Sequence, residues 1–317
     1  MILTYLNCTA SIFLNLKNFF NLKSILITGI SGFVGKYLTK YFNNDFEIIP
    51  FNRTFDFDVD IIVHLAGKAH DIKNVNDPSD YYSVNTDLTK MVFDKFLESN
   101  AKAFITLSSV KAVADKLDVD LTEEHIPNPI THYGKSKLLA EHYILSKRIP
   151  EGKRVYILRP CMIHGSGNKG NLNLLYNIVK RGIPWPLGAF NNKRSFCSID
   201  NLGFIINELI ENNKIPSGVY NIADDEPIST NELVILIAKC LDKKPFILNI
   251  PKFLVKGVSK LGVAFKFPLD SERLNKLTET YIVSNKKIKN AINKPLPMNA
   301  KAGLLKTFQS FNNRNTY

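Results

Sequence analysis

The sequence predicts an α/β fold in which a doubly wound parallel sheet carries a smaller C-terminal lobe. Short apolar runs alternate with amphipathic stretches from residue 25 to about residue 156, and a glycine-spaced turn follows the first of these runs. After Arg159-Pro160 the chain changes to Gly- and Asn-rich connections. Alternating strands and helices are typical of a parallel sheet with helices on both faces. With 317 residues, 45% of them hydrophobic, the chain is long enough for a large core.

The predicted elements follow one another in chain order. Short apolar runs predict strands at 25–28, 46–51, 61–65, 103–107 and 155–158. Apolar residues at three- and four-residue spacing predict helices at 34–42, 82–99 and 133–146. Further along we expect a helix at 172–181, a strand, a helix and a return to the sheet within 195–223, and a helix capped by Ser229-Thr230-Asn231-Glu232.

The stretch from Ile25 to Gly35 reads as a buried strand that runs through a glycine-spaced turn into a helix. A tight turn, a close backbone approach to a pyrophosphate and close helix-to-strand packing each exclude a β-carbon, which accounts for Gly29, Gly32 and Gly35. The helix N-terminus beyond them offers unpaired N–H groups to an anion. This stretch therefore predicts a cradle for a dinucleotide cofactor.

The predicted division of the chain begins with an N-terminal extension, residues 1–22. This segment is apolar, but it lacks a basic start and is interrupted by polar residues, so we expect no membrane-spanning helix. A peripheral membrane anchor is the alternative. The other predicted parts are a dinucleotide-binding domain, 23–165 with a return segment at 195–223, and a substrate-binding lobe, 166–194 and 224–317.

Charge and cysteine usage limit the possible partners. The formal net charge is +12, yet the lysines are scattered instead of forming one stripe, so we expect no nucleic-acid partner. Cys8, Cys161, Cys197 and Cys240 lie far apart and show no metal-ligand or redox spacing. We therefore expect no metal site and a reducing, cytoplasmic location.

A candidate catalytic set follows about a hundred residues after the glycine turn. Tyr133 and Lys137 are four residues apart, so they share one face of a helix. A nearby ammonium favours the phenolate and lowers the pKa of the tyrosine, as acid/base chemistry on an alcohol or ketone requires. Ser109, at the end of the predicted strand 103–107, can bond the same substrate oxygen. In isolation such a pair is more often a surface feature, but its order after the glycine cradle and Ser108-Ser109 favours catalysis.

Together these motifs resemble the extended short-chain dehydrogenase/reductases, and within them the nucleotide-sugar epimerase/dehydratase family. The resemblance covers the chain from Lys23 to about Gln309. The matching motifs are Thr28-Gly29-x-x-Gly32-x-x-Gly35, His64-Leu65-Ala66-Gly67, Asn85, Leu107-Ser108-Ser109, Tyr133-x-x-x-Lys137 and Leu158-Arg159-Pro160. The resemblance implies a Rossmann-type domain, NAD or NADP as cofactor, and a homodimer that pairs through the helices 82–99 and 133–146.

The same resemblance implies roles for individual residues. Ser109 and Tyr133 flank the reacting sugar oxygen, and Lys137 binds the nicotinamide ribose. The implied cofactor contacts are Gly29, Ser31, Gly32, Phe33, Val34, Gly35, Leu65, Ala66, Gly67, Asn85, Tyr133 and Lys137.

The second half of the chain is similar to family members that act at C4 of UDP-linked N-acetyl sugars. The similarity lies in the stretches 159–171, 182–188 and 193–195, and it implies a nucleotide-sugar substrate. The implied substrate-binding residues are Lys111, Asn171, Arg194 and Arg273. Arg194 stands where such enzymes place an arginine against the diphosphate, a role that suits its charged fork. A solvated arginine is the alternative for Arg194, and a structural role is the alternative for Asn171 and Arg273.

Two departures from the family pattern change the expected reaction. Dehydratases carry an Asp-Glu pair directly after the catalytic hydroxyl residue, and here Val110 and Lys111 occupy those places. UDP-galactose epimerases carry an asparagine where this chain has Met162. We therefore expect oxidation and reduction at C4 without elimination of water.

A third departure affects the cofactor. Only residues 54–60 link two predicted core strands, so a strand and helix that usually flank the adenine are expected to be absent. Arg53 suits a ribose 2′-phosphate and hence NADP, whereas NAD is usually bound by an acidic residue at this strand end. Asp56 or Asp58 is a candidate for covering the adenine, although acids in a short loop are more often solvated.

The sequence therefore predicts an NAD(P)-dependent 4-epimerase or 4-ketoreductase of a UDP-hexose or UDP-N-acetylhexosamine, serving surface-polysaccharide precursors. The alternative from another class is a catalytically silent NAD(P)-binding sensor or RNA-associated protein of the same fold. The intact Ser109, Tyr133 and Lys137 argue against that alternative.

Overall fold

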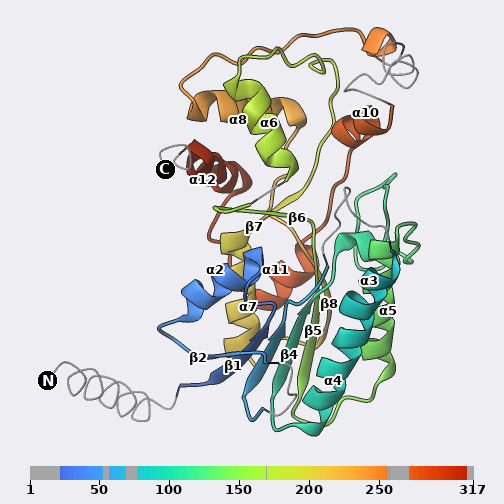
Figure 1. Cartoon of the computed structure of the whole chain (residues 1–317), viewed down its shortest axis with the longest axis vertical. Helices are drawn as coiled ribbons and strands as arrows, with labels where there is room; N and C mark the ends of the chain where they lie inside the picture. Colours follow the sequence, from blue (N-terminus) through green and yellow to red (C-terminus); the bar gives the residue numbers. More distant parts are fainter. Residues whose placement is uncertain are drawn as a thin grey trace, which may run out of the picture.

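A six-stranded sheet forms the larger lobe of the computed structural model, which describes residues 22–52, 57–68, 77–168, 170–255, 257 and 271–312 (Figure 1). All of its strand pairs are parallel, in the order β2-β1-β3-β4-β5-β8. The strands are β1 (Ser24–Thr28), β2 (Glu47–Pro50), β3 (Ile61–His64), β4 (Ala103–Leu107), β5 (Arg154–Pro160) and β8 (Gly218–Ile222). The chain order reverses between β1 and β3, and ligands of such sheets bind at the carboxyl ends of the strands beside this point.

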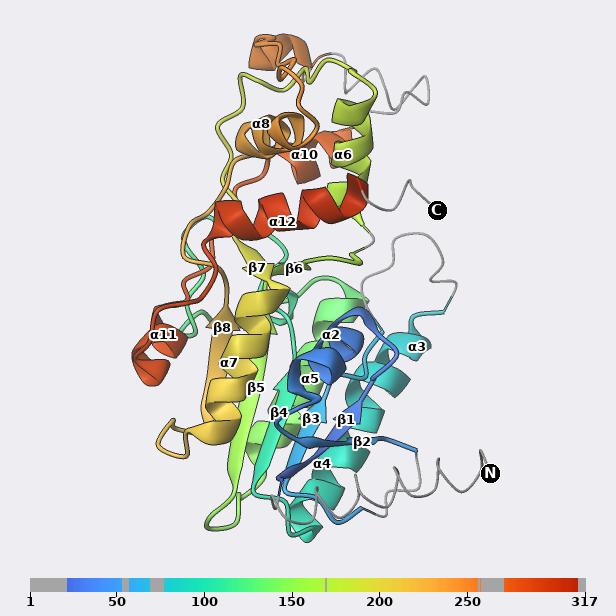
Figure 2. The ribbon, with the colours of Figure 1, turned by 90° about the vertical axis from the view of Figure 1, so that its left-hand side faces the viewer.

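Helices cover both faces of the sheet, which confirms the predicted doubly wound α/β class (Figure 2). One face carries α2 (Phe33–Phe42) and α7 (Ile199–Glu211), and the other carries α4 (Leu88–Glu98) and α5 (His132–Ser146). Side chains alternate along β1: Ile25 and Ile27 join the core beneath α2 and α7, while Leu26 joins the core beneath α4 and α5. A strand buried on both faces reads as a continuous apolar run, which is the pattern in the sequence.

The helix predicted at 82–99 is more complex than its periodicity suggests. A short helix, α3 (Ser79–Tyr82), leads into a π-helical turn, η1 (Ser83–Asp87), before α4 begins at Leu88. Asn85 lies in this turn and is fully buried. The irregular turn therefore places a polar side chain beside the carboxyl ends of the strands.

In the described part of the smaller lobe, helices pack around a separate core (Figure 2). They are α6 (Asn171–Lys180), α8 (Thr230–Cys240), α10 (Ser271–Thr278) and α12 (Ala300–Asn312). Ser229 caps α8 together with Glu232 in a reciprocal capping box, as the sequence predicts. No helix among the described residues has both the length and the apolar character needed to cross a bilayer.

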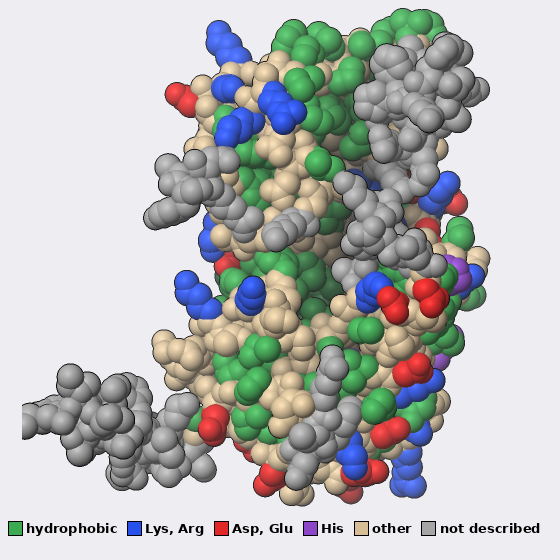
Figure 3. All heavy atoms as spheres, in the orientation of Figure 1, with side chains coloured by type: hydrophobic (Ala, Val, Ile, Leu, Met, Phe, Trp, Pro, Cys, Tyr) green, Lys and Arg blue, Asp and Glu red, His purple; other side chains and the backbone are tan. Residues whose placement is uncertain are grey.

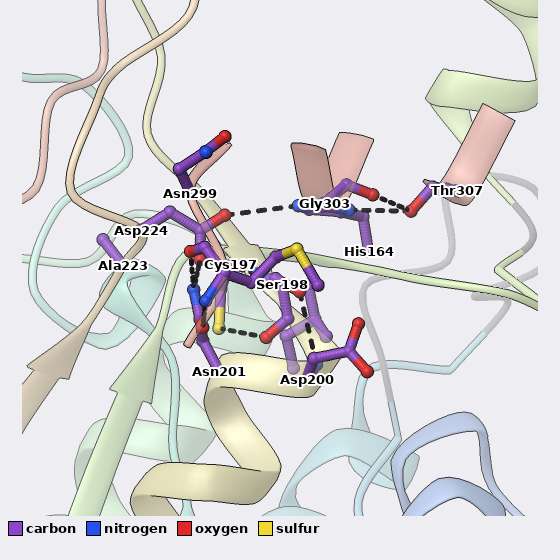
Figure 4. A network of polar contacts seen from close by, with 12 residues as sticks. His164, Cys197, Ser198, Asp200, Asn201, Ala223, Asp224, Asn299, Gly303 and Thr307 are labelled. Atoms are coloured by element: carbon purple, nitrogen blue, oxygen red, sulfur yellow. Dashed lines mark hydrogen bonds and ion pairs between the residues drawn. The ribbon is translucent and has the colours of Figure 1, made fainter. Parts of the chain in front are cut away.

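A short parallel sheet of β6 (Met162–His164) and β7 (Phe196–Ser198) lies between the lobes, and a buried polar network surrounds it (Figure 4). His164 bonds Thr307 of α12 through Nδ1 at 2.9 Å and Asp224 through Nε2 at 3.4 Å. The Asp224 carboxylate also accepts the Ser198 N–H at 2.9 Å and the Asn201 amide at 2.7 Å. The network therefore ties α12 to both strands and to the start of α7.

On the adenine side, β2 is the edge strand of the sheet that the described residues form, in line with the short link predicted there. Arg53, Asp56 and residues 1–21 lie outside the described residues. The proposed adenine contact from Asp58 is wrong. Asp58 precedes β3 and accepts a bond from the Asn100 amide at 3.5 Å, so it lies at the amino ends of the strands, opposite the edge that binds ligands.

Candidate active site

The turn between β1 and α2 has no room for a β-carbon at Gly29 or Gly35. Gly29 has a φ of 69°, and a β-carbon there would lie 2.7 Å from the Ala66 nitrogen. A β-carbon on Gly35 would lie 2.3 Å from the Gly29 carbonyl oxygen. Gly32 precedes α2 without a side chain to cap it, so the first N–H groups of the helix remain for an anionic ligand. The turn therefore fits the pyrophosphate of a dinucleotide.

A buried hydroxyl network holds the next strand end against this turn. Thr28 Oγ1 accepts the N–H groups of Leu65 and Ala66, each at 3.0 Å, and lies 2.9 Å from His64 Nδ1. Burial, and then the charge of Lys137, lower the pKa of His64 to about 3. His64 is therefore neutral at working pH, and its role is to position the backbone of Leu65 and Ala66.

Asn85 fixes the floor of the site next to Gly67. Its Oδ1 accepts the Lys68 N–H at 2.8 Å, and its amide donates to Ser136 Oγ at 3.0 Å. A β-carbon on Gly67 would lie 3.0 Å from Lys137 Nζ and 3.1 Å from Asn85 Oδ1. A side chain at Gly67 would therefore crowd the Lys137 amine and the Asn85 amide.

Ser109, Tyr133 and Lys137 meet at one cavity of about 460 Å³. Ser109 follows β4, and the other two come from α5, whose N-terminus Thr131 caps by accepting the Gly134 N–H. The hydroxyls of Ser109 and Tyr133 are hydrogen-bonded to each other. The sequence-predicted convergence of these three residues is thus seen in the structure, with both hydroxyls in position to bond one substrate oxygen.

The predicted lowering of the Tyr133 pKa by Lys137 is wrong for the protein without ligands. Burial raises the pKa of Tyr133, and the bond from Ser109 offsets only part of that effect. The Lys137 ammonium donates instead to the Leu107 carbonyl oxygen at 2.9 Å. Burial also lowers the pKa of Lys137 to about 8. Helical spacing placed both residues on one face, but it did not reveal that a strand-end carbonyl binds the amine.

A buried ion pair beneath the site was not predicted. Arg159 of β5 donates through Nε to the Glu141 carboxylate of α5 at 3.0 and 3.1 Å, and through Nη2 to the same group. Ser108 donates its hydroxyl to Glu141 as well. The pair fixes the end of β4 against α5. Glu141 lies eight residues after Tyr133, and that helical spacing was the available signal.

The cavity is lined by cations. Lys68, Lys111, Lys137 and Arg194 lie on its wall, and no Asp or Glu lines it among the residues that the structure describes. Lys111 donates to the Asp115 carbonyl oxygen at 2.8 Å and lies 4.2 Å from the centre of the Tyr281 ring. Arg194 is 3.6 Å from Glu279. The wall thus combines an acid/base pair with positive charge suited to a phosphorylated ligand.

Of the other predicted site residues, some line this cavity and some do not. Leu65 and Gly67 line the same cavity, whereas Ser31 and Phe33 face a second hollow between α2 and the loop after β6. Asn171 is exposed at the start of α6 and does not line the cavity. The side chain of Arg273 lies outside the described part of α10.

Several lining residues were missed by the sequence analysis. Tyr281 reaches the cavity from the segment after α10, and Phe196 and Ser195 reach it from β7 and the residue before it. Ser195 ends the matching stretch 193–195 but was given no role, whereas Tyr281 and Phe196 belong to no motif and reach the cavity only through packing. Met162, noted as a departure from the family pattern, also lines the wall.

A doubly wound sheet with a glycine cradle, next to a cavity that holds Ser, Tyr and Lys, defines a dinucleotide-dependent oxidoreductase of the short-chain type. Residues 48–223 match the family model described as the NAD dependent epimerase/dehydratase family, and the chain belongs to this family. The predicted family and the nicotinamide cofactor class are thereby confirmed.

Three comparisons place the chain among characterised proteins. It is 31% identical to a UDP-glucose 4-epimerase of Vibrio cholerae, over 92% of this chain and 97% of that one. It is 29% identical to an N-acetyl-alpha-D-glucosaminyl-diphospho-ditrans,octacis-undecaprenol 4-epimerase of Escherichia coli O157:H7, over 72% and 75%. The solved UDP-N-acetylglucosamine 4-epimerase of Bacillus cereus has the same fold, with a TM-score of 0.71 at 20% identity over 91% and 99%.

Proposed function

We propose that the protein is an NAD(P)-dependent 4-epimerase of a UDP-hexose or UDP-N-acetylhexosamine. The observation that carries the proposal is the meeting of Ser109, Tyr133 and Lys137 in a cavity with four cations and, among the described residues, no carboxylate. The cations suit the diphosphate of a sugar nucleotide. The relatives named as 4-epimerases support the choice of reaction.

The proposed mechanism assigns the proton to Tyr133 and the substrate's position to Ser109. The nicotinamide, when bound, takes up and returns a hydride at C4. As C4 is oxidised, Tyr133 in its phenolate form accepts the proton of the C4 hydroxyl, and Ser109 holds the C4 oxygen in place. The Lys137 ammonium, which is charged below its pKa of about 8 and bonds the Leu107 carbonyl oxygen in this structure, is assigned the role of stabilising the Tyr133 phenolate once substrate and cofactor are bound. After the 4-keto sugar has rotated within the site, Tyr133 returns the proton to its C4 oxygen as the ketone is reduced.

Arg194 and Lys111 hold the diphosphate in this proposal, because their side chains bring positive charge to the same wall. Elimination of water is not part of it. Val110 is buried, and the Lys111 amine bonds the Asp115 carbonyl oxygen, so the positions after Ser109 supply no carboxylate to move a proton at C5.

A 4-ketoreductase is the second candidate, and one observation favours it. Because burial raises the pKa of Tyr133, the phenol keeps its proton at neutral pH. A protonated phenol is the form that donates to a ketone oxygen during reduction.

One experiment with two arms tests the proposal. The purified protein is incubated with UDP-glucose, UDP-N-acetylglucosamine or a polyprenyl-diphosphate-linked N-acetylglucosamine without added cofactor, and the C4 epimers are measured by chromatography. In the second arm, reduced-nicotinamide absorbance is followed with UDP-4-keto-6-deoxy-N-acetylglucosamine and NADH or NADPH. Epimer formation supports the 4-epimerase, and oxidation of the reduced cofactor supports the ketoreductase. If neither product is found, the proposed C4 chemistry on these substrates is contradicted.

We also propose a homodimer that pairs through α4 and α5. Met91, Leu139 and Leu145 are large apolar side chains on these helices, and each is about half exposed, which is costly in water unless a partner covers them. We place the activity in the cytoplasm because the nicotinamide pool and sugar nucleotides are found there. Surface-polysaccharide synthesis is the proposed use of the product, and no nucleic acid takes part.

A further inference from the structure

One face of the small lobe exposes large apolar side chains that belong to none of the sites above. Phe253 is 73% exposed, Phe246 53%, Leu254 49% and Ile183 47%, and Leu248 is also exposed. We call this set the Phe253 face, defined by Ile183, Phe246, Leu248, Phe253 and Leu254. Figure 3 shows hydrophobic side chains gathered over the top of this lobe, with Lys and Arg beside them.

The backbone holds the members of the Phe253 face together. The Trp185 N–H donates to the Phe246 carbonyl oxygen, and the Leu248 N–H donates back to Trp185, each at 2.8 Å. This pairing aligns residues 185–188 with 246–249, and Ile183 lies two residues before it. Buried Trp185 anchors the first segment. Because alternate residues of an extended segment point the same way, Phe246 and Leu248 face outward while the intervening residue packs inward.

Phe253 and Leu254 project from one helical turn that begins at Pro251. The Leu254 N–H bonds the Pro251 carbonyl oxygen at 3.0 Å, and the next residue, Val255, is buried in the core of the lobe. The turn is therefore anchored from beneath, and its two apolar side chains point away from the core.

Basic residues predominate around this face, although Asp242 directly precedes Lys243. The sequence contains no Asp or Glu from residue 243 to residue 269, and none from 165 to 199. Lys243, Lys244 and Lys252 are exposed at or beside the Phe253 face, and none of them forms an ion pair with a carboxylate among the described residues. Lys243 instead donates to the carbonyl oxygen of Lys180.

We propose that the Phe253 face docks the protein on an anionic lipid bilayer. Phenylalanine and leucine side chains enter the interfacial region of a membrane, and surrounding lysines attract anionic headgroups. A second copy of the chain is a poorer partner, because pairing the face with itself would bring the same lysines together. The docking is independent of the chemistry proposed for the cavity, since none of these residues lines it.

The test measures binding of the full chain to vesicles by flotation. Vesicles of phosphatidylethanolamine and phosphatidylglycerol provide the anionic surface, and phosphatidylcholine vesicles provide a neutral one. We expect binding to the anionic vesicles only, and at least a tenfold weaker partition for the variant Phe246→Ser/Phe253→Ser/Leu254→Ser. The matched control Val119→Ser/Ile126→Ser removes exposed apolar side chains on the other lobe and is expected to bind like the wild type.

A second variant tests the proposal independently, in case the triple variant fails to fold. Lys243→Gln/Lys244→Gln keeps the apolar residues and is expected to weaken binding to the anionic vesicles by about fivefold for each lysine. The proposal is overturned if the wild type ignores anionic vesicles, or if both variants bind as tightly as it does, which would assign the binding to residues 1–22 or to another surface. A change of oligomeric mass in the triple variant without a change in vesicle binding would assign the face to a second copy and equally overturn it.

Discussion

At the scale of single residues, the chemistry of this site depends on burial more than on sequence spacing. Tyr133 and Lys137 share a helix face as their spacing predicts, yet burial moves their pKa values in opposite directions, up for the phenol and down for the amine. Their neutral forms are both favoured because a buried charge is costly in a region of low polarity. Burial therefore favours the protonated phenol, which is the form that donates to a ketone oxygen.

Tyr133→Phe is expected to lower turnover by about 10²- to 10⁴-fold, because the variant keeps the ring and loses the proton. Cofactor affinity should stay within a few-fold of the wild-type value, as measured by fluorescence titration of NADH. Tyr82→Phe is the matched control, since Tyr82 bonds His132 and does not line the cavity. Equal loss of cofactor binding and turnover in Tyr133→Phe would contradict the assigned role.

The pH dependence of kcat/KM should follow Lys137. Its pKa of about 8 in the folded protein leaves the amine charged below that pH and neutral above it. Because donation to a ketone oxygen uses the protonated phenol with the charged amine beside it, kcat/KM for ketone reduction is expected to fall above about pH 8, approaching tenfold per pH unit. A profile that stays flat to pH 10 would contradict the role given to the ammonium.

At the scale of elements, β4, β5 and α5 are joined beneath the site by Arg159, Glu141 and Ser108. The carboxylate and guanidinium are both almost fully buried, so each depends on the other for compensation. This contact sets where β4 ends, and therefore where Ser109 lies relative to Tyr133.

Removal of one partner from this pair is expected to be costly. Arg159→Met leaves the Glu141 carboxylate buried without its partner and should lower the free energy of unfolding by about 3–5 kcal/mol. The double variant Arg159→Met/Glu141→Leu removes both charges and should recover most of the loss, as measured by urea unfolding. If the double variant is as unstable as the single one, uncompensated charge is not the cause.

The sequence predicted regular elements well because their signals are local. Strands buried on both faces read as apolar runs, and the capping residues of α8 stand together in the chain, so the five predicted strands and the helices α2, α5, α6 and α8 begin within a residue or two of the predicted positions, whereas the helix predicted at 82–99 does not. The π-helical turn around Asn85 was missed, since a single inserted residue barely changes helical periodicity.

The site residues that belong to local sequence motifs could be predicted. The residues that reach the cavity only through packing of the two lobes could not. Gly29 and Ser109 follow the ends of β1 and β4, and Tyr133 lies at the start of α5. A parallel sheet brings these positions to one edge. Tyr281 comes from the other lobe, more than a hundred residues away, and no local pattern indicates its arrival. Asp58 was a candidate for covering the adenine, but it precedes β3 at the amino ends of the strands, and the sequence carries no signal for that position.

At the scale of the whole molecule, two cores are joined by the network around His164, so the small lobe is held on the sheet by buried polar contacts as well as by the chain. The cavity lies where residues of both lobes meet. Two outer surfaces are proposed to bind partners. The surface of α4 and α5 binds a second copy of the chain, and the Phe253 face binds a membrane.

The dimer is tested by charge introduction. Leu139→Arg/Leu145→Arg places two cations on the exposed face of α5 and is expected to convert the dimer into a monomer in sedimentation-velocity experiments. The triple variant of the Phe253 face is the control and should keep the wild-type mass. A wild-type protein that sediments as a monomer at micromolar concentration would contradict the proposed pairing.

The central claim, hydride transfer at C4, is tested most directly by running the reaction in D₂O and locating deuterium in the epimeric sugar nucleotide by NMR. Hydride that leaves C4 and returns to it does not exchange with water, so the product is expected to carry ordinary hydrogen at C4. Deuterium at C4 would show that the carbon is deprotonated instead, and would contradict the role assigned to Ser109, Tyr133 and Lys137.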